Sequence, residues 1–281
     1  MIDRRQFLTG ALGGVLVFRQ SSDPAKVYDM GTNVLALSTP DGLILVDSGA
    51  PQYGSALPKR VLAVFNTHYH LEITGSNETF GQAGAKIIAH ERTRQWMSTD
   101  YWIPAEDRFE KARPNAARPT ETFLTTGSLR AGGEQIDYGY LPLAHTSGDI
   151  YIFFKTSNVL AVGDVASPQR DPSLDYFTGA WIGGRVDAMD IILKLSNEQT
   201  RIVPAYGPVL TRAEFKAERD MMAAIYDRTV DRVREGDSPE DMLKAGVMNG
   251  LSRTFKDPQK FLYDVHKGLW AHHNKLAPNV V

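Results

Sequence analysis

The sequence predicts an α/β protein in which two β-sheets pack face to face with helices on the outside. Short apolar runs of strand length recur along the chain and alternate with turn signals and helical patterns. Helix-start signals stand at Thr211 and Ser238, each with an acidic residue close behind. Of the 281 residues, 42% are hydrophobic and 23% are charged, which is ordinary for a globular protein with a large core.

The N-terminal half is expected to be rich in strands. Pro40-Asp41-Gly42 separates two apolar runs and therefore indicates a hairpin. Strands are expected at 34–38, 43–46, 61–65 and 86–89. Short helices are expected at 77–84 and 91–98. The aromatic, charged and proline-interrupted segment 99–119 is expected to form a loop or short-helix insertion over the mouth of a site.

The C-terminal half shifts towards helices. A hairpin at Gly132-Gly133 leads to strands expected at 135–143, 150–154, 159–162 and 201–203. Apolar residues at helical spacing predict a helix over 186–195. A capping box at Thr211 predicts a long helix that ends near Gly236, and the tail 238–275 is expected to be mainly helical.

The segment N-T-H-Y-H-L-E-I-T-G-S-N at 66–77 follows the buried strand at 61–65. Two histidines two residues apart at a strand end point the same way, so His68 and His70 can bind one metal ion at about 2.0–2.1 Å each. The segment resembles the metal-binding signature of the metallo-β-lactamase superfamily, N-T-H-x-H-x-D-H-x-G-x-N. Glu72 and Ile73 depart from it, because they stand where Asp and His are usual.

Four further motifs resemble the same superfamily and come in the expected order. Asp47 ends an early strand beside the site, His145 lies in A-H-T-S-G-D, and Asp164 ends the strand L-A-V-G-D. In V-P-A-Y-G-P, Tyr206 replaces the usual late histidine. The resemblance implies a four-layer αββα sandwich of two mixed sheets, the metallo-β-lactamase fold.

The resemblance also implies a metal site and roles for its residues. The expected ligands are His68, His70, His145 and Asp164. The expected catalytic residues are Asp164 and Glu72, as base or water-orienting groups, and Tyr206, as a donor to an oxyanion. Asp47 is a plausible hydrogen-bond acceptor for a ligand histidine. One tightly bound zinc ion is expected, with a second site that is weak or absent, because Ile73 cannot ligate and a neutral phenol ligates poorly.

Other histidines and one glycine-rich run carry weaker signals. Structural or surface roles are expected for His90, His266, His272 and His273. The run at 175–185 combines aromatic residues, Asp175 and Arg185 with three glycines, and both substrate contact and simple packing remain open for it.

The N-terminus resembles a twin-arginine (Tat) export signal. Arg4-Arg5 precedes a mildly apolar run at 8–18, which is too short to span a membrane. We therefore expect a signal and spacer at 1–26, a metallo-β-lactamase-like domain at 27–235 and a helical extension at 236–281 packed on that domain. Both a cleaved and an uncleaved signal stay open. The expected location is the bacterial periplasm.

The expected function is a periplasmic metal-dependent hydrolase that cleaves an ester, thioester, lactone or amide bond of a small molecule through metal-bound hydroxide. β-Lactam cleavage is one candidate among several, since a fold does not fix a substrate. The alternatives are a non-hydrolytic binding or partner module of a periplasmic redox system and an iron-based oxidoreductase. A net charge of -2 gives no case for nucleic acid, and the chain contains 0 cysteines, so any metal ligands are nitrogen and oxygen.

Overall fold

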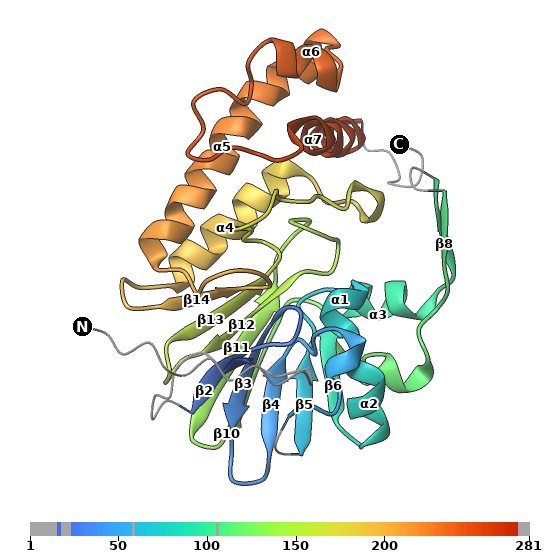
Figure 1. Ribbon diagram of the computed structural model, residues 1–281, viewed down its shortest axis with the longest axis vertical. Helices are drawn as coiled ribbons and strands as arrows, with labels where there is room; N and C mark the ends of the chain where they lie inside the picture. Colours follow the sequence, from blue (N-terminus) through green and yellow to red (C-terminus); the bar gives the residue numbers. More distant parts are fainter. Residues whose placement is uncertain (1–15, 18–23, 58–59, 105–106, 275–281) are drawn as a thin grey trace, which may run out of the picture.

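Two β-sheets lie face to face in the lower half of the view in Figure 1. The computed structural model describes residues 16–17, 24–57, 60–104 and 107–274. The seven-stranded sheet has the order β1-β2-β3-β4-β5-β6-β9 and the five-stranded sheet the order β10-β11-β12-β13-β14. Each sheet contains both parallel and antiparallel pairs, so both are mixed. The predicted sandwich of two mixed sheets is confirmed.

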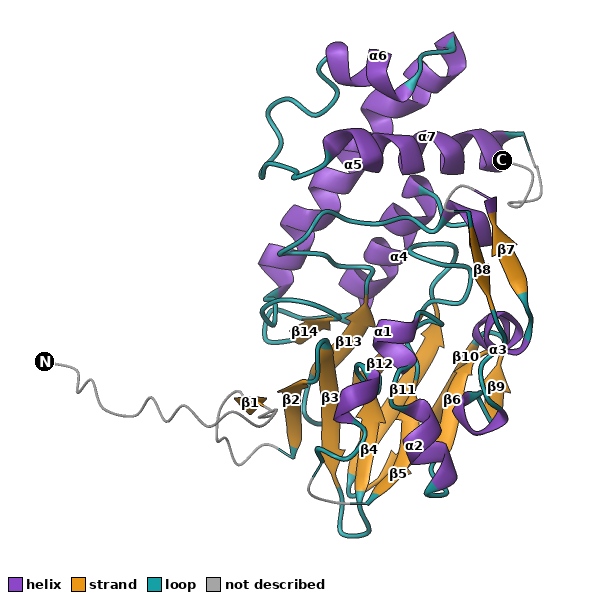
Figure 2. Ribbon diagram, turned by 45° about the vertical axis from the view of Figure 1, so that its right-hand side comes forward, coloured by secondary structure: helices purple, strands orange, loops and turns teal. Residues whose placement is uncertain are grey.

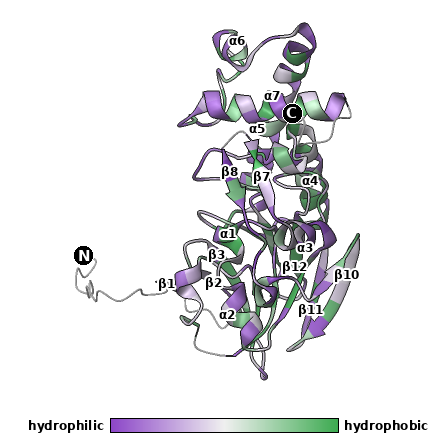
Figure 3. Ribbon diagram, turned by 90° about the vertical axis from the view of Figure 1, so that its right-hand side faces the viewer, coloured by the Kyte–Doolittle hydropathy of each residue, from purple (hydrophilic) through white to green (hydrophobic). Residues whose placement is uncertain are grey.

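The strands of the larger sheet are β1 (Leu16–Val17), β2 (Ala25–Asp29), β3 (Asn33–Ser38), β4 (Leu43–Val46), β5 (Val61–Phe65), β6 (Lys86–His90) and β9 (Glu121–Phe123). Those of the smaller sheet are β10 (Thr126–Ala131), β11 (Glu134–Tyr140), β12 (Ile150–Phe154), β13 (Val159–Gly163) and β14 (Arg201–Pro204). Apolar residues on the facing surfaces form a core between the sheets that includes Phe65, Ile152 and Phe154. Figure 3 shows the apolar colouring of β12, all five residues of which are buried.

Helices cover the outer face of each sheet, which makes four layers (Figure 2). On the larger sheet these are α1 (Leu71–Thr74), α2 (Asn77–Gln82) and α3 (Glu91–Ser98). On the smaller sheet they are α4 (Ile182–Leu195) and α5 (Arg212–Glu235). Helix α7 (Pro258–His273) packs on these two helices, and the short α6 (Pro239–Lys244) packs on α7. Phe215 of α5 and Phe261 and Leu269 of α7 join one core cluster with α4, so the C-terminal helices pack against the second sheet's layer.

Capping explains where the predicted helices begin and end. The Thr211 hydroxyl accepts from the Glu214 N–H, the Glu214 carboxylate accepts from the Thr211 N–H, and α5 ends at Gly236 with φ of 88°. Ser238 and Asp241 form a second capping box at α6. His90 also has a structural role, because its Nδ1 accepts from the Arg92 N–H at the start of α3 and its ring stacks on Tyr140.

Three expected elements differ in the structure. Segment 99–119 contains a two-stranded ribbon, β7 (Tyr101–Ile103) and β8 (Arg108–Glu110), rather than only loop or short helix. Helix α4 begins at Ile182, four residues before the expected start, because the glycines at 183 and 184 fit the close approach of Leu143 and Trp181. The tail is helical only at α6 and α7, with a non-helical connection at 245–257.

The predicted twin-arginine signal at Arg4-Arg5 lies outside the described residues. Within the described ranges, no helix combines the length and the apolar character that crossing a membrane requires.

Candidate metal centre

The centre lies at the carboxyl ends of β4, β5 and β13, where polar side chains follow buried apolar strands. Asp47 follows β4, His68 and His70 follow β5, and Asp164 follows β13. Parallel pairing of β4 with β5 brings the first two of these strand ends to the same edge of a sheet. Ligand sites of α/β proteins commonly form at such an edge, outside the carboxyl ends of the strands.

His145 reaches the site from a tight turn between β11 and β12. The Asp149 carboxylate accepts from the N–H groups of His145 and Thr146, at 2.6 and 2.8 Å, and from the Thr146 hydroxyl at 2.7 Å. Burial raises the pKa of Asp149 although these bonds act in the opposite direction. The A-H-T-S-G-D motif therefore encodes a turn that closes on its own final aspartate and presents the His145 ring.

The three predicted histidines meet. One nitrogen of each ring lies within 4.8 Å of the others, and His70 Nδ1 is 3.1 Å from His145 Nε2. The rings of His68 and His145 are buried, whereas the His70 side chain is 25% exposed. Burial lowers the pKa of His68 and of His145, so these two rings favour the neutral form that binds metal.

The remaining nitrogen of each ring has its own partner, which fixes the ring's orientation. His68 Nδ1 is 3.2 Å from the Thr67 hydroxyl, and that hydroxyl donates to Asp47 at 3.0 Å. His145 Nδ1 is 3.0 Å from the Ser173 carbonyl oxygen. Asp47 thus supports His68 through Thr67 instead of accepting from a ligand histidine directly. Burial raises the pKa of Asp47 to about 8.

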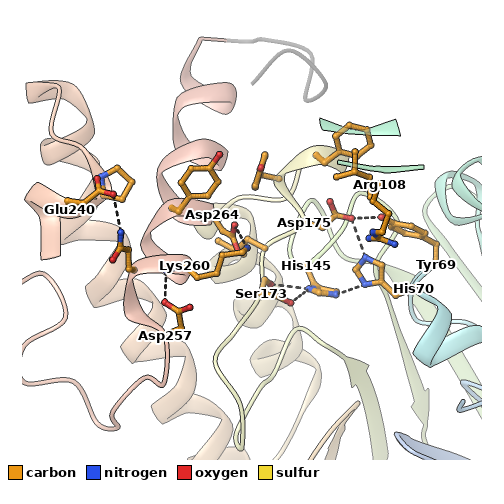
Figure 4. Close-up of a pocket in the computed structure, with 17 residues that line it drawn as sticks. Tyr69, His70, Arg108, His145, Ser173, Asp175, Glu240, Asp257, Lys260 and Asp264 are labelled. Atoms are coloured by element: carbon orange, nitrogen blue, oxygen red, sulfur yellow. Dashed lines mark hydrogen bonds and ion pairs between the residues drawn. The ribbon is translucent and has the colours of Figure 1, made fainter. Parts of the chain in front are cut away.

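His70 is oriented by Asp175, which lies far away in the sequence. Asp175 Oδ2 is 3.3 Å from His70 Nε2 and accepts from the Tyr69 hydroxyl at 2.6 Å (Figure 4). Burial opposes protonation of His70, but the hydrogen bond and negative charge of Asp175 outweigh it and raise the pKa of His70. The carboxylate therefore leaves His70 Nδ1 pointing at the other two rings.

Asp164 completes the fourth side. Its Oδ2 is 3.7 Å from His68 Nε2 and 3.8 Å from His145 Nε2. His68 Nε2 and Asp164 Oδ2 are both buried and have no hydrogen-bond partner among the described residues. Buried polar atoms without partners are costly, so converging ring nitrogens beside such a carboxylate fit a bound cation. Three imidazole nitrogens form a donor set typical of zinc, and the Asp164 carboxylate lies beside that set.

The other two predicted catalytic residues are Glu72, whose charge acts on His70, and Tyr206. Glu72 is exposed on α1, and the adjacent Ile73 is fully buried. Tyr206 contacts the site through Arg170, whose guanidinium stands 3.6 Å from the Tyr206 ring centroid and donates to Asp164 Oδ1 at 2.6 Å. Burial raises the pKa of Tyr206 to about 12. The catalytic roles of Asp164, Glu72 and Tyr206 stay predictions.

A pocket of about 630 Å³ opens beside the histidines and extends to α7 (Figure 4). His70 and His145 form part of its lining near the site, and Lys260 and Tyr263 line it on the side of α7. Aromatic side chains that line it are Tyr69, Tyr176, Phe177 and Tyr263. Ile103 and Arg108 of the β7–β8 ribbon also line it, which agrees with the expected position of segment 99–119 over the mouth.

Sequence reasoning missed the structural parts played by Arg170, Asp175 and Arg185. Arg185 is 1% exposed and donates to the backbone carbonyls of Asp164 and Ser173, so it ties together two loops of the site. Burial lowers the pKa of Arg185 to about 10. The glycine-rich run at 175–185 was the available signal for two of these residues, whereas Arg170 carried none.

Comparison with known proteins agrees with this fold. Residues 27–234 match the metallo-beta-lactamase superfamily, and the chain belongs to that family. Metallo-beta-lactamase IND-1 of Chryseobacterium indologenes is 25% identical over 187 residues, which cover 63% of this chain and 72% of that protein. The 2,4-dinitroanisole O-demethylase subunit alpha of Nocardioides sp. (strain JS1661) is 24% identical over 245 residues, covering 82% of this chain but only 65% of that relative.

Solved structures show the same fold at low sequence identity. A metallo-beta-lactamase from Pontibacter korlensis superposes with a TM-score of 0.59 at 18% identity, covering 74% of this chain and 99% of that chain. A double mutant of the sec-alkyl sulfatase PisA1 superposes with a TM-score of 0.65 at 13% identity, covering 92% of this chain and 50% of that chain.

Proposed function

We propose that this protein is a zinc-dependent hydrolase that cleaves an ester, thioester, lactone or amide bond of a small molecule. The observation that carries the proposal is the convergence of three ring nitrogens, each from a histidine whose other nitrogen has a separate partner. Three nitrogen ligands with an open fourth position are typical of catalytic zinc, whereas closed four-ligand sites are typical of structural zinc.

Zinc held there would lower the pKa of a bound water towards about 7 and polarise a carbonyl oxygen. Asp164 is suited to accept a proton at Oδ2, since this oxygen faces the site while Oδ1 is held by Arg170. Asp175 and Thr67 keep His70 and His68 in fixed orientations, so the ligand nitrogens need not reorganise when the metal binds.

The pocket limits the class of substrate. A volume of about 630 Å³ suits a molecule of drug size, and four aromatic side chains offer flat apolar walls. Its two cationic side chains are already paired, Lys260 with Asp264 at 2.7 Å and Arg108 with Glu110. We therefore favour an uncharged substrate with an aromatic or alicyclic body over a carboxylated one.

The names of the relatives widen the set of bonds to be tested. One similar protein is a metallo-beta-lactamase and another is an O-demethylase subunit. β-Lactams and aryl methyl ethers therefore join the esters, thioesters and lactones in the panel, although low identity carries neither activity to this chain.

The test is hydrolysis by purified protein, with and without a chelator. Zinc-loaded protein should hydrolyse at least one substrate, chelation should abolish turnover, and added zinc should restore it. His145→Ala is the test variant, because it removes one ligand from the three-histidine face. His90→Ala is its matched control, because it removes a histidine that caps α3. Turnover that survives chelation would contradict the proposal. Metal binding without turnover of any substrate would favour the non-hydrolytic binding module, and iron in the purified protein would favour redox chemistry.

We also propose export to the periplasm by the twin-arginine route, on the strength of Arg4-Arg5 and the apolar run behind them. Fractionation of cells that express the full chain tests it. The wild type should accumulate in the periplasm, and the variant in which both arginines are replaced by lysine should stay in the cytoplasm. Equal distribution of the two proteins would contradict export by this route.

A further inference from the structure

The carboxylate of Asp164, which faces the three histidines, forms an ion pair with the side chain of Arg170. The guanidinium of Arg170 donates to Asp164 Oδ1 at 2.6 Å, and Asp164 is only 2% exposed. The same guanidinium lies over the Tyr206 ring, 3.6 Å from its centroid. Arg170 is therefore held between a buried carboxylate and an aromatic face, a geometry that suits Arg better than Lys.

The loops around Arg170 hold it there. Pro168 and Gln169, which precede it, lie against Gly207, the neighbour of Tyr206. Arg185 donates to the backbone carbonyl of Asp164 at 2.7 Å and to the Ser167 hydroxyl at 3.0 Å. These contacts hold the loop 164–170 in place, so the position of Arg170 beside Asp164 is fixed.

A second metal ion does not fit this side of the centre. Ile73 is fully buried and has no donor atom, and Tyr206 presents its ring face to a guanidinium. Glu72 is exposed, and the buried carboxylate of Asp164 already has its Oδ1 bound by Arg170. Adding a divalent ion beside a guanidinium would place two cations on one carboxylate, which Coulomb repulsion in a buried site disfavours.

We propose that the Arg170 guanidinium permanently takes the place of a second metal ion beside Asp164 and so keeps the centre mononuclear. The guanidinium stays charged at every working pH, and its charge cannot be removed by chelation or exchange. It also fixes Asp164, because binding of Oδ1 leaves Oδ2 directed at His68 and His145. Arg170 is in this sense a positioning residue that acts through Asp164.

This inference rests on the proposed three-histidine centre, and the experiment separates the two. The readout is the number of zinc ions per chain, from elemental analysis and calorimetric titration of metal-free protein. The test background is Ile73→His with Tyr206→His, which supplies two nitrogen donors while Arg170 remains. We expect one zinc ion per chain in this double variant, as in the wild type, and two after Arg170→Ala is added.

The matched control adds Arg219→Ala to the double variant instead. Arg219 is also part of an arginine–carboxylate pair, with Asp190 at 2.7 Å, on helices α5 and α4 away from the histidines. This control should bind one zinc ion. Circular dichroism and retention of the first zinc ion show that each variant has folded.

The outcomes distinguish the two claims. Two zinc ions in the double variant with Arg170 in place would overturn the inference, and so would a single ion after Arg170→Ala in a folded protein. Absence of zinc from the wild type would instead overturn the proposed metal centre itself.

Discussion

Replacement of Asp175 by Asn removes a single negative charge from the carboxylate that orients His70. Oδ2 of Asp175 lies 3.3 Å from His70 Nε2 and accepts from the Tyr69 hydroxyl at 2.6 Å. An amide nitrogen at that position would be a donor, so His70 Nε2 would become an acceptor and Nδ1 would carry the proton. Nδ1 is the nitrogen that faces His145, at 3.1 Å, so the variant favours the tautomer that cannot bind metal.

Loss of such a partner typically weakens metal binding about 10–100-fold, which corresponds to about 1.4–2.7 kcal/mol. The assay is competition for zinc with a chelating dye at pH 8. Tyr69→Phe is the matched control, because it removes the hydrogen bond from Tyr69 to Asp175 and leaves the carboxylate on His70. We expect a change in zinc affinity below about threefold. Unchanged affinity in Asp175→Asn, or an equal loss in Tyr69→Phe, would refute the reasoning.

Three further predictions concern stability. Gly163 has φ of 56°, and an added Cβ would lie 2.6 Å from Thr67 Oγ1. Gly163→Ala should therefore lower the free energy of unfolding in urea by about 2–4 kcal/mol, against about 1 kcal/mol for Gly84→Ala, where φ is 86° and the space is open. Equal losses would contradict this reasoning. Burial raises the pKa of Asp47 from 3.8 to about 8. The metal-free wild type should therefore lose stability relative to Asp47→Asn as the pH rises from about 5 to 8, by up to about 1.4 kcal/mol per pH unit. Parallel stability curves for the two proteins would contradict the raised pKa. Zinc at about 100 times its Kd should contribute about 2.7 kcal/mol, so chelation should lower Tm by about 5–11 °C, and an unchanged Tm would argue against a resident metal.

Local signals were sufficient for much of the fold. The capping boxes at Thr211 and Ser238 set the starts of α5 and α6, because a cap depends on residues within one turn of each other. The three histidines were also predictable, since each lies in a motif that combines its own strand end or turn with the ligand. Asp149 illustrates this, as it closes the His145 turn from four residues away.

Contacts between distant loops were not predictable in the same way. Asp175 meets Tyr69 across 106 positions of the sequence, and no local pattern marks either residue as the partner of the other. Arg170 lies in a loop without periodicity, so its contacts with Asp164 and Tyr206 depend on how three loops pack. The β7–β8 ribbon was missed for a related reason, because its short strands pair only with each other and alternate too briefly to be recognised.

The most direct test of the three-histidine centre is anomalous diffraction at the zinc edge from crystals of the zinc-loaded wild-type protein. One peak should lie about 2.0–2.1 Å from each of His68 Nε2, His70 Nδ1 and His145 Nε2, with no second peak between Asp164 and Tyr206. A peak elsewhere, a peak that reaches only one or two of these nitrogens, or a second ion in the position of the Arg170 guanidinium would contradict it.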